Sequence, residues 1–302
     1  MEAALGVWYP RGGVHQIALA LARLAGELGV EIRLDAPVSK IVTQGSRATG
    51  VLLGDSEVQS ADVIVANAEW GHTQRQLLDR GERVAGREYG CSGVLFLAAV
   101  PGPVAGPHHT FVLSSDFAGN LADIFERRCL PENPSIYLSR PTATDPALAP
   151  AGTELLYILV PCPTLDSGVD WNAELPFFRK KVFDRLSRVG LDNLDSRVLA
   201  EAVLTPETFG ARYNLTAGSA FGLAATLLQS GPFRPTIRSR RYDNLYHVGA
   251  SSHPGGGVPM VMLSGRMAAE AVEEDWGTVT SATPSTRPDA SMETTWSGAS
   301  SS

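Results

Sequence analysis

A run of glycines between a strand-like and a helix-like segment limits the fold of this chain more than any other feature. The apolar residues Leu245–Gly249 predict a strand, Gly255–Gly257 a tight loop, and the segment from Pro259 to Glu273 a helix. Glycines without a Cβ let the backbone approach a flat or anionic ligand, and the unpaired N–H groups that begin a helix favour negative charge. Pro259 suits the first helical turn, where its missing N–H costs nothing. By pattern alone, a ligand-binding loop and a ligand-free turn are equally good interpretations.

The N-terminal part combines one helix with short strands. Ile17, Leu21, Leu24 and Leu28 recur at helical spacing and predict a helix over 14–28, which Gly29 ends. Strands are expected next over 30–34, 38–43, 48–53 and 62–66, the second and third forming a hairpin. A helix followed by strands and hairpins is typical of part of an α/β layer.

The middle of the chain has a different pattern. Strands expected over 94–100, 111–114, 136–138 and 155–160 indicate an antiparallel sheet. A long helix is expected over 170–189, and its apolar stripe is typical of core packing rather than of a ligand-facing surface. In the segment from Gly277 to Ser302, thirteen of 26 residues are Ser or Thr, which predicts a disordered tail.

Composition narrows the class of protein. The chain has 302 residues, of which 44% are hydrophobic, enough for a sizeable core. Its 25 basic and 32 acidic side chains give a net charge of -7, which argues against a nucleic-acid partner because such proteins need a basic face. Cys91, Cys129 and Cys162 form no CxxC pair, so we expect buried thiols in a reducing compartment rather than disulfides or a zinc site.

Several polar or mixed segments have simpler explanations than catalysis. His108 and His109 would point apart on a strand, with no other ligand at metal-binding spacing, so no metal site is expected. The charged residues of 116–128 predict a solvated helix face with weak ion pairs. The aromatic and basic residues of Phe177–Phe183 are a candidate for contact with a membrane surface, although an ordinary amphipathic core helix is the favoured interpretation. No apolar stretch of roughly 18 residues predicts a membrane-spanning helix, and the first residues do not form a secretory signal.

Four segments resemble, in the same order, the bacterial-type phytoene (carotenoid) desaturase family of FAD-dependent, amine-oxidase-like flavoproteins. They lie within 6–13, 124–150, 212–235 and 245–266. Four ordered matches are far more specific than one glycine loop. The resemblance therefore implies that the loop at 249–259 contacts a flavin.

The resemblance also implies the fold. We expect a mixed α/β chain in which a partial, Rossmann-like FAD-binding domain is interrupted by an antiparallel-sheet substrate domain with helices. The expected parts are 1–86 of the FAD-binding domain, a substrate-binding domain over 87–240, a flavin-contacting strand, loop and helix over 241–276, and the tail 277–302. The family opens with a GxGxxG turn that holds the FAD pyrophosphate, and this sequence contains no such motif. We therefore expect the C-terminal part of a desaturase, without the AMP-binding half.

The resemblance carries over a set of cofactor contacts. Val38 falls in the strand whose backbone faces the adenine, and the glycine loop falls beside the ribitol, pyrophosphate and isoalloxazine. The implied FAD-binding residues are Val38, Gly249, Ala250, Ser251, His253, Gly255, Gly256, Gly257, Val258 and Pro259. His253 is either a proton shuttle or, the favoured interpretation, an ordinary loop histidine. No catalytic acid or base is assigned.

The function implied is desaturation of a carotenoid precursor such as phytoene, by hydride transfer to flavin N5 and loss of a neighbouring proton. A polyene substrate partitions into lipid, so we expect a cytoplasmic protein with peripheral contact at the inner face of the cell membrane. A missing N-terminal half or a partner chain would complete the enzyme. Two alternatives stay open: a related isoprenoid oxidoreductase, such as a carotenoid isomerase or ketolase, and a non-catalytic remnant or interaction subunit without the GxGxxG motif.

Overall fold

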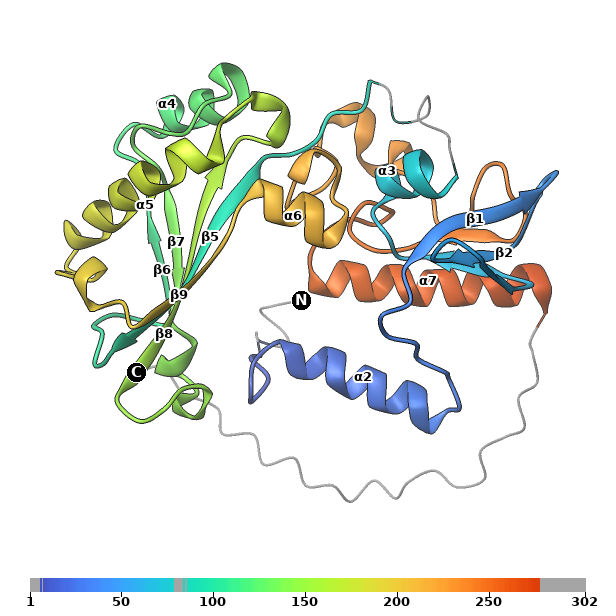
Figure 1. Ribbon diagram of the computed structural model, residues 1–302, viewed down its shortest axis with the longest axis horizontal. Helices are drawn as coiled ribbons and strands as arrows, with labels where there is room; N and C mark the ends of the chain where they lie inside the picture. The colour runs from blue at the N-terminus through green and yellow to red at the C-terminus, as the bar shows by residue number, and fades with distance from the viewer. Residues whose placement is uncertain (1–5, 7, 79–83, 85, 278–302) are drawn as a thin grey trace.

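The computed structural model describes residues 6, 8–78, 84 and 86–277 (Figure 1). The N-terminal part holds helix α2 (His15–Glu27) and an antiparallel sheet of β1 (Val38–Gln44), β2 (Arg47–Leu53) and β3 (Glu57–Ser60). Strand β4 (Ile64–Ala66), helix α3 (Trp70–His72) and the π-helical turn η1 (Thr73–Leu77) follow. The expected hairpin is present, because Gln44 pairs with Arg47 across the Gly45–Ser46 turn.

A five-stranded antiparallel sheet forms the largest element. Its order is β6 (His109–Val112), β7 (Ile136–Ser139), β8 (Thr153–Cys162), β5 (Ser92–Pro101) and β9 (Ala200–Leu204). The helices beside it are α4 (Phe117–Ala122) with the π-helical turn η3 (Asp123–Arg127), α5 (Trp171–Ser187) and α6 (Pro206–Tyr213). Short 3-10 turns connect these parts: η4 (Pro141–Ala143), η5 (Pro146–Leu148), η6 (Leu165–Ser167), η7 (Asp195–Arg197), η8 (Thr216–Gly218), η9 (Leu227–Gln229) and η10 (Gly231–Phe233).

Helix α5 covers one face of this sheet and completes the main hydrophobic core. In Figure 1 the sheet is seen close to edge-on, with α5 on its outer side and α2, α6 and α7 on the other side. Phe178, Val182 and Phe183 of α5 are at most 2% exposed and pack on the buried strand residues Phe96 and Ile158. Asp170 begins the helix by accepting hydrogen bonds from the N–H groups of the first turn. The membrane candidate Phe177–Phe183 therefore contributes Phe178, Val182 and Phe183 to the core, as its favoured interpretation held, whereas Phe177 is 73% exposed.

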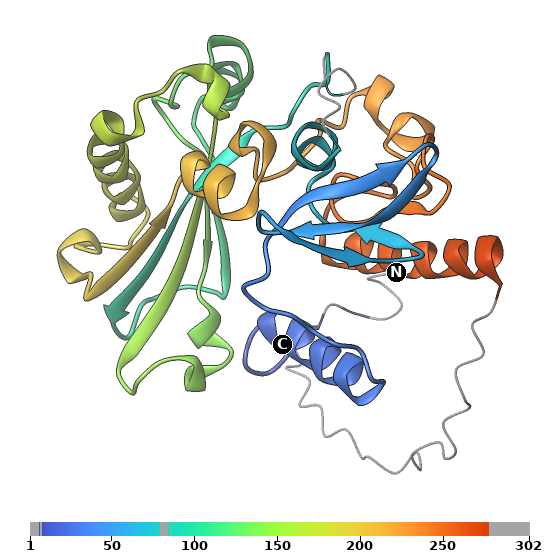
Figure 2. The same cartoon turned by 45° about the vertical axis from the view of Figure 1, so that its right-hand side comes forward.

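The last strand returns to the N-terminal part of the chain. Strand β10 (Leu245–His247) pairs in parallel with β4, and helix α7 (Val258–Trp276) follows it. The fully buried Asn244 side chain accepts a hydrogen bond from the Ala48 N–H and donates to the carbonyls of Ala48 and Asp62. These bonds tie the hairpin, β4 and β10 into one layer, which Figure 2 shows beside α7. The expected mixed α/β fold with an antiparallel sheet is confirmed.

Three expectations from the sequence were wrong, each for a different reason. Residues 30–34 form no strand, because no strand of the described residues lies beside them to pair with. Not all thiols are buried: Cys162 is, but Cys129 is exposed. His108 and His109 do not point apart, since His108 precedes β6 and the two ring centroids are 4.2 Å apart. The expected tail lies beyond the described residues apart from Gly277, and within the described part no helix is long and apolar enough to cross a bilayer.

Candidate functional site

The glycine loop between β10 and α7 adopts backbone conformations that side chains disfavour. Gly249 has φ +94°, and a Cβ there would lie 2.7 Å from Asn67 Oδ1. Gly257 has φ +102° at the N-terminal cap of α7, with no atom within 4 Å of a Cβ. The first position thus needs a glycine for close packing, and the second needs one for its left-handed backbone.

The end of this loop is open to a ligand. Gly256, Gly257, Val258 and Pro259 are exposed where the 19-residue helix α7 begins, and no side chain of the described residues caps that helix. The N–H groups of a first helical turn carry partial positive charge and accept an anionic group at close range. The loop therefore fits a phosphate or the N1–C2=O edge of a reduced flavin.

Residues outside the loop bind its residues 250–252 and hold them in place. Ser251 Oγ accepts a hydrogen bond of 2.8 Å from the Trp70 N–H. The buried Arg234 guanidinium donates to the carbonyl of Ala250 through Nη2 at 2.6 Å and to that of Ser252 through Nε at 3.1 Å. Burial lowers the pKa of Arg234. Because no carboxylate of the described residues is bonded to Arg234, this cation serves the loop carbonyls.

Two further backbone contacts complete the support. The Gly249 N–H donates to Ser264 Oγ of α7 at 2.9 Å, and the His253 N–H donates to the Pro235 carbonyl at 2.8 Å. The sequence analysis assigned no role to Ser264 or Trp70. A signal for Arg234 was present, since it lies in one of the segments that resemble the desaturase family.

Val38 does not lie with the loop. It is the first residue of β1, is 38% exposed, and lines a hollow together with His72, Arg75 and Thr216. Gly249–Pro259 lie together because they are consecutive in the chain. Val38 lies in a separate hollow. Its contact with the adenine stays a prediction, as do the cofactor contacts of the loop.

A buried carboxylate lies next to the loop. Glu69 is 8% exposed, and its Oε2 accepts hydrogen bonds from the His72 N–H at 2.8 Å and from Thr216 Oγ1 at 2.6 Å. Its Oε1 is buried with no hydrogen-bond partner among the described residues. Burial and the charge of Glu69 raise the pKa of the nearby Tyr89. Glu69 precedes Trp70, whose N–H is bonded to Ser251 of the loop, so it is an acid–base candidate beside the loop that the sequence did not single out.

The second face of the five-stranded sheet carries no charged side chain. Strand residues alternate between faces, and those opposite the α5 core belong to this open face. Gly93 and Leu95 of this face are buried. The strand residues on it are Gly93, Leu95, Leu97, Ala99, Pro101, His109, Phe111, Tyr137, Ser139, Thr153, Leu155, Tyr157, Leu159, Pro161, Ala200, Ala202 and Leu204. An antiparallel sheet with one wet face normally places polar residues there. This face is instead suited to an apolar ligand.

A groove of ≈ 530 Å³ runs along part of the open face, lined among others by His109, Phe111, Tyr137 and Leu159. At its polar edge, Tyr137 Oη and His109 Nδ1 are 2.8 Å apart. His108 Nδ1 lies 2.6 Å from Thr144 Oγ1, and burial lowers the pKa of His108. The Gly12 N–H donates to Asp145 Oδ2 at 2.8 Å. Two of the segments that resemble the desaturase family therefore meet beside this groove.

Comparison with known families identifies the class of protein to which the chain belongs. The model of the flavin containing amine oxidoreductase family matches residues 1–273. The chain belongs to this family. Its cofactor is accordingly FAD, as the resemblance implied.

Two relatives of the chain carry the names of carotenoid enzymes. It is 40% identical over 275 residues to the zeta-carotene-forming phytoene desaturase of Myxococcus xanthus, covering 89% of this chain and 53% of that protein. It is 37% identical over 276 residues to the 4,4'-diapolycopene oxygenase of Methylomonas sp, covering 89% of this chain and 56% of that one. The chain thus spans about half the length of the curated relatives it matches.

A solved structure supports the fold. An oxidoreductase from Methanosarcina mazei superposes with a TM-score of 0.61 over 86% of this chain and 55% of its own, at 18% sequence identity. At that identity the likeness shows the amine-oxidase-like fold alone.

Proposed function

We propose that this chain forms part of an FAD-dependent enzyme that desaturates a long polyene hydrocarbon, a carotenoid precursor such as phytoene. The observation that carries the proposal is the uncharged open face of the five-stranded sheet, in a chain whose family is flavin-containing. A hydrocarbon offers no group for a hydrogen bond or an ion pair, so it can be bound only by apolar burial. Leu97, Tyr157 and Leu159 of the open face supply such a surface.

The roles of the residues follow from their positions. FAD, when bound, supplies a hydride acceptor. Gly256, Gly257 and the first turn of α7 would hold the anionic edge of the flavin, and Arg234 and Ser251 keep the loop in shape. The open face would orient the polyene and exclude water. Loss of a proton requires a base, for which Glu69 is the candidate on this chain.

A complete FAD site needs more surface than the glycine loop. All residues of α2 and of 30–34 are at least partly exposed, with Ile32 at 50% and Leu34 at 80%. We propose that residues outside this sequence, or a partner chain, cover these apolar side chains and supply the AMP-binding part of the site. We place the enzyme in the cytoplasm, in peripheral contact with the inner face of the cell membrane, because its proposed substrate dissolves in lipid.

The experiment combines flavin binding with product mass. The chain, together with the N-terminal half or partner chain that completes the FAD site, is incubated with FAD and phytoene in vesicles, and mass spectrometry is expected to find products lacking pairs of hydrogens. Leu159→Glu should lower conversion more than about tenfold, because a charge in an apolar groove is costly, while FAD binding stays unchanged. Val58→Glu is the control, since Val58 is 57% exposed on β3, away from the open face. Conversion by Leu159→Glu at the wild-type rate would refute the role of this face.

A second candidate is oxidation of a polyene with insertion of oxygen. The identity of 37% to the 4,4'-diapolycopene oxygenase favours it. The same assay separates the two, because the product then gains oxygen instead of losing hydrogen, and an isomerase product keeps its mass. A non-catalytic remnant predicts no tight FAD binding. A dissociation constant in the micromolar range or below, about -8 kcal/mol, would count against that alternative.

A further inference from the structure

The helical segment that follows β6 presents its large apolar side chains to solvent. Phe117, Leu121 and Phe125 recur at intervals of four residues along α4 and η3, and are 52%, 39% and 56% exposed. Residues spaced in this way share one side of a helix. In Figure 1 the segment lies beyond the ends of β6 and β7, at one end of the sheet. The segment therefore forms an apolar ridge, defined as Phe117, Leu121 and Phe125.

The side of the segment that faces the protein is partly polar. Asn120 and Asp123 are 4% and 9% exposed, and Ile124 is buried between them. A helix on the surface of a globular protein normally shows the opposite arrangement, with its apolar stripe toward the core. The sequence analysis expected a solvated charged face here. That expectation was wrong for Asp123, since the fold turns this carboxylate inward and the phenylalanines outward.

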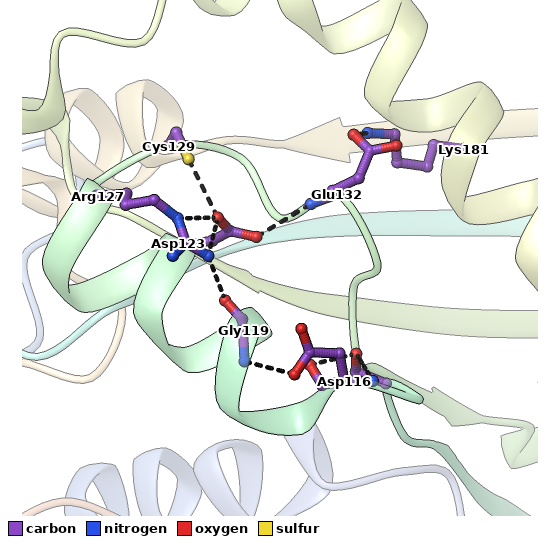
Figure 3. Close-up of polar contacts among 8 residues, drawn as sticks. Asp116, Gly119, Asp123, Arg127, Cys129, Glu132 and Lys181 are labelled. Atoms are coloured by element: carbon purple, nitrogen blue, oxygen red, sulfur yellow. Dashed lines mark hydrogen bonds and ion pairs between the residues drawn. The ribbon is translucent and has the colours of Figure 1, made fainter.

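The polar groups beneath the ridge are bonded within the protein (Figure 3). Asp123 Oδ1 accepts a hydrogen bond of 2.7 Å from Arg127 Nε, and its Oδ2 accepts one of 3.2 Å from the Glu132 N–H. Asp116 caps α4 by accepting from the Gly119 N–H at 2.8 Å. The arginine lowers the pKa of Asp123, so this carboxylate stays charged and bonded near neutral pH. The ridge can thus enter an apolar medium without exposing these groups to it.

The segment is anchored to the sheet and to α5. Asn120 Oδ1 accepts a hydrogen bond of 2.7 Å from the Ser135 N–H, directly before β7. Lys181 of α5 forms an ion pair of 2.6 Å with Glu132, as Figure 3 shows. These contacts fix the direction in which the ridge points. Its side chains cannot turn inward without losing them.

Charge does not explain what the ridge binds. Arg127 is paired with Asp123, Arg128 with Asp166 at 2.5 Å, and Lys181 with Glu132. Arg127, Arg128 and Lys181 are therefore neutralised within the protein, whereas Arg185, which donates to the Leu113 carbonyl, forms no ion pair with a carboxylate of the described residues. A surface that bound anionic headgroups would need unpaired basic side chains.

The ridge lies near the open face of the sheet along the chain. Phe111 and Leu113, which are 70% and 64% exposed, lead from β6 to α4 and also line the groove with Tyr137 and Leu159. Ser114, Ser115 and Asp116 lie between Leu113 and Phe117, so one short polar segment separates the ridge from the apolar side chains that reach the groove.

We propose that Phe117, Leu121 and Phe125 insert into the surface of a lipid bilayer, and that Phe111 and Leu113 link this site to the groove. This inference rests on the proposed function, because a hydrocarbon substrate is stored in bilayers and must be taken from one. A ridge of phenylalanine and leucine fits the headgroup boundary of a bilayer, whereas protein interfaces are enriched in Tyr, Trp and Arg. Binding depends on apolar insertion and not on anionic lipid.

The test is flotation of the 302-residue chain with phosphatidylcholine vesicles, at low and at high salt. We expect the same bound fraction at both salt concentrations. The combined variant Phe117→Ser, Leu121→Ser and Phe125→Ser should lower the partition coefficient at least about tenfold, because three apolar side chains lose their burial in lipid. Leu199→Ser is the matched control: Leu199 is 64% exposed next to Ala200, which pairs with Ala99 near the other end of the sheet.

A second measurement needs no substitution. Hydrogen exchange on the wild-type chain should slow in residues 113–127 when vesicles are added, and stay the same around Leu199. Wild-type binding by the triple variant would overturn the proposal, as would binding that requires anionic lipid and disappears in salt. Self-association that the triple variant abolishes without vesicles would overturn it in favour of a second copy. No readout involves FAD or turnover, so its failure leaves the test of the desaturase function intact.

Discussion

Helices α5 and α2 have similar sequence patterns but differ in burial. Both show apolar residues at helical spacing, yet α5 buries Trp171, Phe178, Val182, Phe183 and Leu186, whereas no residue of α2 is buried. Helix α5 lies on a five-stranded sheet that this chain forms by itself. Helix α2 packs on no sheet of the described residues, and all its side chains are at least partly exposed. An amphipathic pattern thus predicts a helix, but the helix is buried only where another element packs against its apolar face.

The largest difference is expected between matched core and surface substitutions in these helices. Phe183 is 1% exposed and packs edge-on against Phe96, with ring centroids 6.0 Å apart. Phe183→Ala should lower the free energy of unfolding by about 3–5 kcal/mol, because it removes burial and leaves a cavity. Leu24→Ala in α2, where Leu24 is 49% exposed, should change it by less than about 0.5 kcal/mol. Urea unfolding of both variants measures the contrast.

A loss of several kcal/mol for Leu24→Ala would break the comparison. It would mean that α2 is covered in solution, for instance by a second copy of the chain. Sedimentation of the same samples would show whether such an assembly forms.

A smaller effect is expected from pH, on the flavin side of the molecule. Burial lowers the pKa of His247 in β10 from 6.5 to about 4. Below pH 6.5 the unfolded chain binds a proton that the folded chain does not, so stability is complete above that pH and falls as the pH drops toward 4. Between pH 7.5 and pH 5 this residue should cost about 2 kcal/mol of stability.

His247→Gln provides the comparison, because glutamine does not titrate. Urea unfolding at the two pH values should show a smaller loss for the variant than for the wild-type chain. Equal losses would indicate that His247 is reached by water and that β10 is less buried than the core beneath α5.

The smallest effect concerns two glycines with open space around them. Gly257 has φ +102° in the loop, whereas Gly265 lies within α7, and a Cβ would meet no atom within 4 Å at either site. Gly257→Ala should cost about 1 kcal/mol through backbone strain and weaken FAD binding roughly fivefold. Gly265→Ala should instead stabilise the helix by about 0.5–1 kcal/mol and leave FAD binding unchanged.

Unfolding and flavin fluorescence titrations separate these outcomes. If Gly257→Ala binds FAD as tightly as the wild-type chain, the open end of the loop is not a flavin contact. A loss of stability in Gly265→Ala would show instead that this part of α7 is packed in solution.

Periodicity in the sequence predicted most element types well. The helices at α2, α5 and α7, the hairpin and the long strands β5 and β8 lie where the patterns placed them. Local spacing suffices there because each element satisfies its own backbone hydrogen bonds or those of a neighbour in sequence. The strand expected over 30–34 failed because a strand takes its partners from elsewhere in the fold, and the pattern says nothing of whether they are present.

For the candidate site, the sequence alone determined the loop, since only glycine tolerates the backbone of Gly257 and the close approach of Gly249 to Asn67. The same residues carried the resemblance that led to FAD. Only the tertiary structure brought Arg234 and Trp70 to that loop, buried Glu69 beside it, and left one face of the sheet apolar and open. It also turned Phe125 outward and Asp123 inward. These outcomes depend on contacts between residues far apart in the chain, which no local pattern records.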